Sequence, residues 1–344
     1  MKSSIIAGID LAKKIFHIVK VDDAGKMIEK KKVIREEFLS YIATFEKDTL
    51  VAMEACSGCH YWAQEISQMG YAVKLLKTKD VNVYAQSRQK NDFNDALAIT
   101  KAARDPELKN VHAKNTYEQD ISFLHKTRRN TIRDRVQKTN SMISTLYEYG
   151  YMTALSKLRF CQGCKNEVEV AYEEGYIRED VYGMLLEECD EIFALCAKEK
   201  TIDKRIVAQN KQNSKALKLQ KIMGIGPINA SILSIAPMEG YPEAREFSAS
   251  IGLVPRQHTS GDQIMLGSIT KQGDRYMRTM LIQGARSIAM RAKNAQNPQD
   301  KLLIWAQKKF REGKPFNLIC VGLANKLARI AYAVIINNTE YHAI

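Results

Sequence analysis

Short apolar runs alternate with polar segments along the first 110 residues. Apolar runs at 4–9 and 15–21, a turn signal (DDAG) and the segment 26–34 predict three strands joined as a hairpin or meander. Helical spacing at 36–45 and 61–69 then alternates with strand-like runs at 50–53 and 72–76, and a long helix is predicted to start near Asn91. Three strands followed by alternating helices and strands predict a mixed α/β sheet.

The pattern changes in the middle of the chain, which has no proline between about residues 115 and 212. Apolar side chains recur there at helical spacing with basic side chains between them, which predicts a helical hairpin or a coiled coil that could pair subunits. The stretch 166–200 holds eleven acidic and three basic residues. We expect this acidic stretch to stay off nucleic acid and to face another subunit or solvent.

The last third returns to apolar helical stretches at 228–236, 275–292 and 318–336, with a loop predicted over 253–273. The chain of 344 residues therefore divides into a mixed-sheet region at 1–112, a helical region at 113–213 and a mostly helical region at 214–344. Its formal net charge of +13 indicates a polyanionic partner, either nucleic acid or an anionic membrane surface. No apolar run approaches the length of a membrane span, and no signal peptide is expected.

Four acidic residues of the first region fall at the ends of predicted elements. Asp10 closes the first strand and Glu54 closes a later one, so both can project from one edge of the sheet. Asp92 and Asp95 are three positions apart and share one face of the predicted helix. Each acid alone fits a helix cap or a solvated charge. Together they are hard oxygen ligands of the kind that Mg²⁺ prefers, with Mn²⁺ as a substitute, and two ions could hold both oxygens of a phosphodiester displacement.

These residues also carry a resemblance to a known family. Residues 6–14 (IAGIDLAKK) look like the opening strand of RuvC-like nucleases, and with 53–55 (MEA) and 90–96 (KNDFNDA) they resemble the DEDD transposases of the insertion-sequence-110 family. The last third is similar to the transposase domain of that family through GLVPR at 252–256, Ser260, GSITKQG at 267–273 and Arg278. The departures are local: Met277 replaces a usual Leu, and residues 56–59 replace a Gly/Thr-rich run.

The resemblance implies an RNase H or RuvC-like domain over 1–112, a helical coiled-coil region over 113–213 and a transposase domain over 214–344. It implies Mg²⁺ bound by Asp10, Glu54, Asp92 and Asp95, and a nucleophilic Ser260 that becomes covalently linked to DNA. Members of the family use a structured guide RNA, or bridge RNA, that pairs with donor and target DNA. They act as homo-oligomers, here a dimer to a tetramer, in which the serine of one subunit meets the acids of another.

Considered without the resemblance, Ser260 lies in a predicted loop, where a serine most often bonds its own backbone. Basic residues around Ser260, before the acid pair and in the middle region predict a phosphate-lined cleft with salt-dependent affinity, although each alone fits a solvated charge. These residues are Lys90, Arg128, Arg129, Arg256, Lys271, Arg275 and Arg278. Two cysteine pairs, 56/59 and 161/164, give a weaker signal for zinc.

Three functions fit these residues. The first is an RNA-guided transposase that uses Ser260 and Mg²⁺. The second is a RuvC-like endonuclease that resolves DNA junctions with metal-activated water, and the third is a non-catalytic nucleic-acid-binding protein. The segment around Ser260 favours the first over the second, and the presence of all four acids disfavours the third. We expect a cytoplasmic, nucleoid-associated enzyme with no membrane partner.

Overall fold

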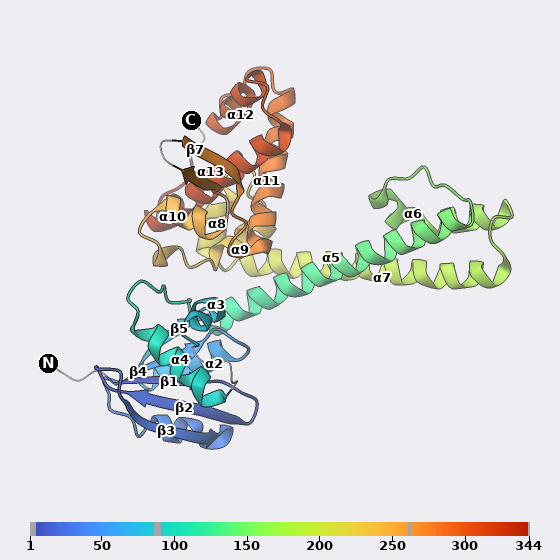
Figure 1. Ribbon diagram of the computed structural model, residues 1–344. Helices are drawn as coiled ribbons and strands as arrows, with labels where there is room; N and C mark the ends of the chain where they lie inside the picture. Colours follow the sequence, from blue (N-terminus) through green and yellow to red (C-terminus); the bar gives the residue numbers. More distant parts are fainter. Residues whose placement is uncertain (1–4, 86–90, 261–262, 343–344) are drawn as a thin grey trace. The chain divides into compact units, whose positions relative to one another are not determined.

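A computed structural model describes residues 5–85, 91–260 and 263–342. The chain folds into two compact units, Met1–Gln119 and Asp120–Ile344. The first unit contains a five-stranded sheet, and the second is helical apart from one β-hairpin (Figure 1). The candidate acids lie in the first unit and Ser260 lies in the second.

The sheet of the first unit has the strand order β3-β2-β1-β4-β5. Its strands are β1 (Ile6–Asp10), β2 (Ile15–Val21), β3 (Met27–Ile34), β4 (Leu50–Glu54) and β5 (Ala72–Leu76). The first three strands form an antiparallel meander, whereas β4 pairs in parallel with both β1 and β5. All five predicted strands are confirmed to within two residues, and the mixed sheet fits an RNase H-like domain.

Helices cover both faces of the sheet because side chains along each strand alternate between the two faces. The helices and 3₁₀ turns of this unit are η1 (Arg35–Glu37), α1 (Phe38–Ile42), α2 (Cys59–Gln68), α3 (Thr78–Val81), η2 (Asn82–Tyr84) and α4 (Asp92–Arg104). Phe16 and Met53 belong to a core that includes residues of α1 and α2, and Val19 and Ala52 belong to a core that includes residues of α4. Asp10 is four residues after Ile6 of the α4 core, and Glu54 is two residues after Ala52 of the same core. Both acids therefore lie on the face of the sheet that α4 covers.

Gly8 allows α4 to lie directly on the middle of β1. A Cβ atom at this position would lie 2.4 Å from the carbonyl oxygen of Ala96 and 2.6 Å from Cγ2 of Thr100. A larger residue would therefore push α4 away from the sheet. This close contact brings the first turn of α4 near the end of β1, where Asp10 stands.

The long helices predicted for the middle of the chain are confirmed as α5 (Thr116–Glu148), α6 (Lys157–Glu173) and α7 (Glu179–Asn210). Helices α5 and α7 lie side by side and run antiparallel (Figure 1). Residues with increasing numbers along α5 pair with residues with decreasing numbers along α7. The joining ion pairs are Arg128–Asp203 at 2.6 Å, Arg135–Glu199 at 3.1 Å and Lys138–Glu188 at 2.7 Å.

From the sequence we expected the acidic stretch to face solvent or another subunit. The structure differs in part, because some of its acidic residues contact basic residues of the same chain. Glu188, Glu191 and Glu199 of α7 contact the basic residues Arg135 and Lys138 of α5 in the same chain. Part of the negative charge of the acidic stretch is therefore neutralised by basic residues of α5 within the same chain.

The rest of the second unit is a helical bundle. It contains α8 (Ser214–Gln220), α9 (Pro227–Ser234), η3 (Met238–Gly240), α10 (Ala244–Ser250), α11 (Arg275–Asn294), α12 (Lys301–Arg311) and α13 (Phe316–Ile336). Among the described residues, α13 alone is long and apolar enough to cross a membrane by length and composition, and half of that apolar window is buried. Leu323, Leu327 and Ala331 of α13 are fully buried with residues of α11, as expected of a core helix.

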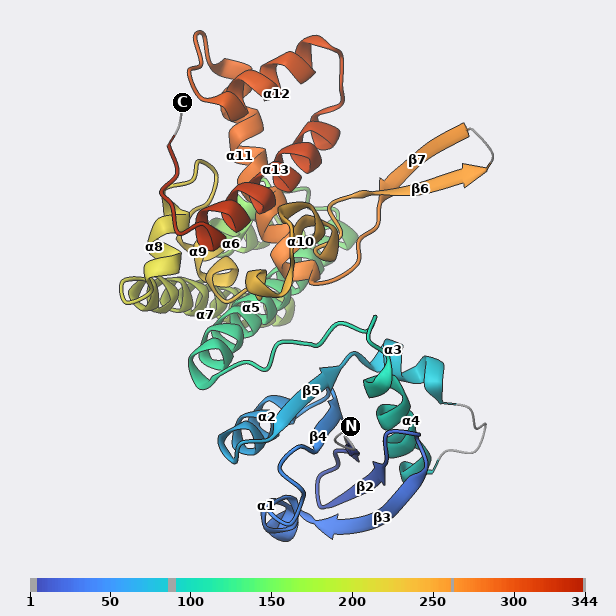
Figure 2. The ribbon, with the colours of Figure 1, turned by 90° about the vertical axis from the view of Figure 1, so that its left-hand side faces the viewer.

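The segment predicted as a loop at 253–273 is instead a β-hairpin of β6 (Pro255–Ser260) and β7 (Gln263–Ile269), which projects from the helices of its unit (Figure 2). The prediction failed because residues 256–259 of the first strand are polar and exposed. In the second strand, residues 264–266 (IML) are apolar in succession, so neither strand shows the alternation of apolar and polar residues that marks a strand.

Buried polar side chains join four helices of the second unit. His125 of α5 is 2% exposed, and its Nδ1 and Nε2 atoms lie 3.0 Å from Tyr276 Oη and 3.1 Å from Ser231 Oγ. One turn along α5, Arg128 Nε donates to Asp203 of α7. Burial, assisted by the charge of Arg128, lowers the pKa of His125 to about 4. The imidazole is therefore neutral at physiological pH.

Lowering the pH from 7 to 4.5 is expected to destabilise the second unit through His125. The unfolded chain protonates this imidazole near pH 6.5, whereas the folded chain does so only near pH 4. Between these values the unfolded state binds more protons, so the free energy of unfolding falls as the pH drops, by about 2–3 kcal/mol at pH 4.5. Urea unfolding followed by Trp305 fluorescence in a Trp62→Phe background measures this change. His125→Gln is expected to flatten it, and an unchanged pH dependence in that variant would contradict the assignment.

Candidate metal centre and catalytic hairpin

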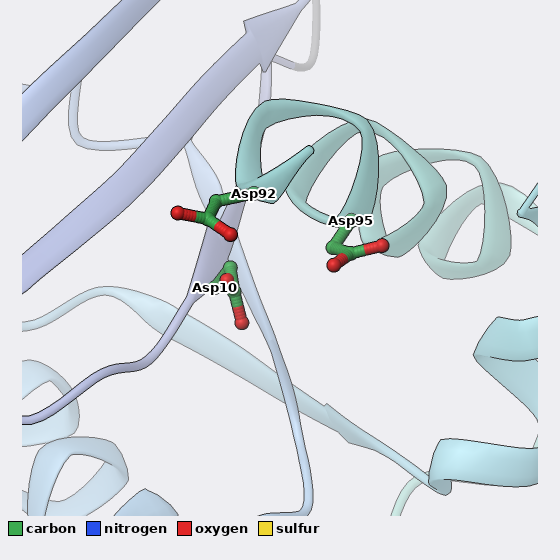
Figure 3. A group of neighbouring side chains, drawn as sticks. All are labelled: Asp10, Asp92 and Asp95. Atoms are coloured by element: carbon green, nitrogen blue, oxygen red, sulfur yellow. The ribbon is translucent and has the colours of Figure 1, made fainter. Parts of the chain in front are cut away.

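Three carboxylates meet on the α4 face of the sheet. Asp10 is the last residue of β1, and Asp92 and Asp95 stand in the first turn of α4 (Figure 3). One oxygen from each lies within 4.8 Å of the others. The side chain of Asn91 caps the helix by accepting from the backbone N–H of Phe93 at 3.0 Å. The cap fixes where α4 begins, and with it the positions of Asp92 and Asp95.

The electrostatics of this cluster favour a bound cation. Burial, together with the negative charges of Asp95, Asp92 and Glu54 in that order, raises the pKa of Asp10 to about 6. Acids held together in this way repel one another, and a divalent cation with oxygen ligands would remove that repulsion. The donor set therefore fits a hard divalent metal ion, held by Asp10, Asp92 and Asp95.

Glu54 stands beside this cluster without belonging to its closest group. It ends β4, the strand parallel to β1, and its Oε1 accepts a hydrogen bond of 2.5 Å from the hydroxyl of Thr78. Its charge contributes to the raised pKa of Asp10. The structure therefore gathers three of the four predicted ligands and places the fourth nearby, where Thr78 holds its carboxylate.

His17 is a residue of this site that the sequence analysis missed. It pairs with Asp10 across β1 and β2 and is 7% exposed. Its Nδ1 lies 3.4 Å from Oδ2 of Asp92, and its ring packs edge-on against Phe93 with the centroids 4.9 Å apart. A polar residue at a buried phase of a predicted strand, opposite a predicted ligand, was the signal that could have revealed it.

Ser260 is the last residue of β6 and pairs with Gln263 at the far end of the hairpin. The other end of the hairpin is held tightly to the bundle. Gly273 has a φ of +68°, and a Cβ atom there would lie 1.8 Å from the carbonyl oxygen of Ser250. Arg278 of α11 donates to the carbonyl oxygens of Ile251 and Gln272 at 2.7 and 2.6 Å. The hairpin thus presents Ser260 from a fixed base.

The predicted phosphate contacts fall into distinct groups. Arg129, Arg256, Lys271 and Arg275 are exposed. Arg128 is paired with Asp203, and Arg278 is 8% exposed with its guanidinium on backbone carbonyls. A phosphate contact by Arg278 does not fit this burial, because its donors already hold the hairpin base. Lys90 lies outside the described residues.

Three of the four cysteines considered for zinc, Cys59, Cys161 and Cys164, are buried in apolar cores, whereas Cys56 is half-buried. Cys161 and Cys164 are buried in the core of the helical region together with Phe160 and Val168. Burial raises the pKa of the Cys56 thiol to about 11, which keeps it protonated near neutral pH. Thiolates are the form that binds zinc, so the environment of Cys56 does not favour that chemistry.

Comparison with known proteins identifies similar sequences along nearly the whole chain. Residues 7–151 match a transposase family model of the DEDD type of IS110, and residues 216–300 match the model of the IS116/IS110/IS902 transposase family. The chain is 33% identical to the transposase of insertion sequence element IS1328 from Yersinia enterocolitica, over 99% of both chains. It is 32% identical to the transposase of IS1111A from Coxiella burnetii, over 99% of this chain and 92% of that one. A probable family 20 transposase from Pseudomonas aeruginosa is 32% identical over 97% of both chains.

Proposed function

The chain belongs to the IS116/IS110/IS902 family of transposases, and on this premise we propose that Ser260 cuts DNA by forming a covalent bond to it at a metal centre built on Asp10, Asp92 and Asp95. As a transposase the protein is an enzyme that cuts and rejoins DNA. The observation that carries the proposal is the convergence of three carboxylates from two separate elements on one face of the sheet.

Ser260 is proposed to act as the nucleophile in a phosphoryl transfer. The Ser260 hydroxyl attacks the scissile phosphorus, loses its proton, and forms a phosphoester as the bond from phosphorus to the leaving sugar oxygen breaks and that oxygen takes up a proton. One phosphoester bond is formed for each one broken, so a DNA hydroxyl can reverse the step and rejoin the strand. Arg278 holds the base of the hairpin to the helical bundle, and positioning of a nucleophile lowers the barrier to its attack.

The acids have a separate task. Asp10, Asp92 and Asp95, with Glu54 beside them, would hold Mg²⁺ or Mn²⁺. When bound, such an ion neutralises charge on the phosphate and so favours attack by an oxygen nucleophile. His17 contacts Asp92 from the neighbouring strand and limits the orientations of that carboxylate.

We further propose that Ser260 and the acids act in one site contributed by two subunits of a homo-oligomer. The motivation is that the two sets of residues belong to separate compact units of the chain. A subunit outside the assembly would then lack a complete site and would not cut DNA. The acid cluster also serves the competing hypothesis, a junction endonuclease that uses water, and the two differ in whether a protein–DNA bond forms.

A structured guide RNA is expected to co-purify with the protein. The net charge of +13 favours a polyanion, and the resemblance points to an RNA that pairs with donor and target DNA. Sequencing of RNA from the purified protein should recover one discrete species encoded beside its reading frame. The control is the same purification from cells that lack this flanking DNA. Recovery of only bulk cellular RNA in both preparations would contradict RNA guidance.

A further inference from the structure

We propose that Lys30 and Lys32 of β3 bind phosphates of the DNA strand close to the bond that is cut, and so guide that strand into the metal centre. Both lysines are exposed on the edge strand of the sheet. The proposal rests on the proposed function for the location of the cut, but the DNA contact itself can be measured without any cutting.

Strand register places these lysines on the face that carries the acids. Lys32 pairs with His17 across β3 and β2, and His17 pairs with Asp10 across β2 and β1. The three residues form one row across the sheet. Adjacent strands lie about 4.8 Å apart, so the Cα atoms of Lys32 and Asp10 are separated by about 10 Å. A nucleic-acid strand advances about 3.4 Å per nucleotide along the helix axis, so this separation corresponds to about three nucleotides.

Phe93 holds both ammonium groups near the acid cluster. The Nζ atoms of Lys30 and Lys32 lie 5.5 and 5.7 Å from the centroid of its ring. Phe93 directly follows Asp92 in the first turn of α4 and packs against His17. The cation–π contacts orient the lysines but leave their donors free to bind an anion.

The charged side chains on the opposite face of β3 make different contacts. Lys31 lies 4.3 Å from the ring centroid of Tyr41, and Glu29 accepts from Tyr41 and pairs with Lys20 at 2.5 Å. Across residues 5–85, 91–260 and 263–342, neither Lys30 nor Lys32 has a carboxylate within ion-pair distance. Lys31 has no ion pair either, but the charge of Glu29 acts on it from the same face of the strand. More of the uncompensated positive charge of β3 therefore lies on the face that carries the metal centre, where a phosphate backbone would meet it.

Lysines on an edge strand also discourage pairing with other sheets. That role would be shared by Lys30, Lys31 and Lys32, because all three lie on the same exposed edge. Phosphate binding, by contrast, requires Lys30 and Lys32 and excludes Lys31. Lys31 is thus a matched control with the same charge on the same strand.

The test measures binding of the full chain to a fluorescein-labelled 30-base-pair DNA duplex of arbitrary sequence by fluorescence anisotropy. EDTA is present so that no cutting occurs, and NaCl is varied from 50 to 200 mM. Each lost phosphate contact lowers the slope of log affinity against log salt by about 0.9. Lys32→Gln is expected to lower the slope by about 0.9 and Lys30→Gln/Lys32→Gln by about 1.8, with weaker binding at low salt. Lys31→Gln is expected to leave the slope unchanged, and Lys30→Arg/Lys32→Arg to retain the original slope.

Two outcomes would overturn the proposal. An unchanged slope in Lys30→Gln/Lys32→Gln would mean that these residues do not contact DNA. An equal change in Lys31→Gln would mean that only net charge matters. Because the assay needs neither a metal ion nor Ser260, absence of a protein–DNA adduct would reject the proposed serine chemistry and leave this contact intact.

Discussion

Asp92→Asn is expected to slow DNA cutting by about 10³-fold while leaving DNA binding largely intact. The substitution keeps the shape of the side chain but removes one of the three converging negative charges. A metal ion at such a site contributes several kcal/mol of charge stabilisation, and about 4 kcal/mol corresponds to a factor of about 10³ in rate. The rate of strand cutting in Mg²⁺, measured on DNA that carries the ends of the element with the co-purified RNA, tests the effect.

This variant is not expected to lose activity by unfolding. The charge of Asp92 is among those that raise the pKa of Asp10, so its removal relieves repulsion in the folded chain. The matched control is Asp48→Asn, which changes an exposed aspartate of the same unit between α1 and β4. Asp48→Asn should cut DNA at the normal rate. Normal cutting by Asp92→Asn would remove the acid cluster from the mechanism.

The first unit could be predicted closely because its sequence signals agree with its packing. The strands carry short apolar runs bounded by turn residues, and two-residue periodicity decides which side chains share a face. Asp10 and Glu54 end strands β1 and β4, which are adjacent and parallel, and this explains why they lie near each other. The contact between β1 and α4 at Gly8 was not predictable, since it depends on how closely the helix approaches the sheet.

The roles of two polar residues, Arg278 and His17, were not predicted correctly from the sequence. Arg278 was grouped with the phosphate contacts because a basic residue near Ser260 fits that role. Its guanidinium instead binds the carbonyls of Ile251 and Gln272, which are free only because the chain turns at the base of the hairpin. His17 was missed for a similar reason: its importance depends on what lies opposite it in the sheet. Neither partner is encoded by local periodicity.

Ser260→Ala is expected to abolish a covalent protein–DNA adduct completely. The variant lacks the side-chain hydroxyl that would form the phosphoester. The wild-type protein should remain covalently attached to one end of the cut DNA after denaturation. Ser268→Ala is the matched control, because Ser268 is an exposed serine on β7 of the same hairpin. Denaturing gels of reactions with labelled DNA measure the adduct. If wild-type protein cuts DNA without forming an adduct, water is the nucleophile and the junction endonuclease is favoured.

Mixing Ser260→Ala protein with Asp92→Asn protein is expected to restore part of the activity that each variant lacks. If one subunit contributes the serine and another contributes the acids, some mixed assemblies contain a site with an intact Ser260 and an intact acid cluster. If both sets act within one subunit, every site in the mixture carries one defect and no activity returns. Recovery of the untagged variant when the tagged variant is purified by its tag establishes that they assemble together. Inactivity of a mixture that does assemble would therefore reject the site shared between subunits, while the adduct measurement would still decide whether Ser260 is the nucleophile.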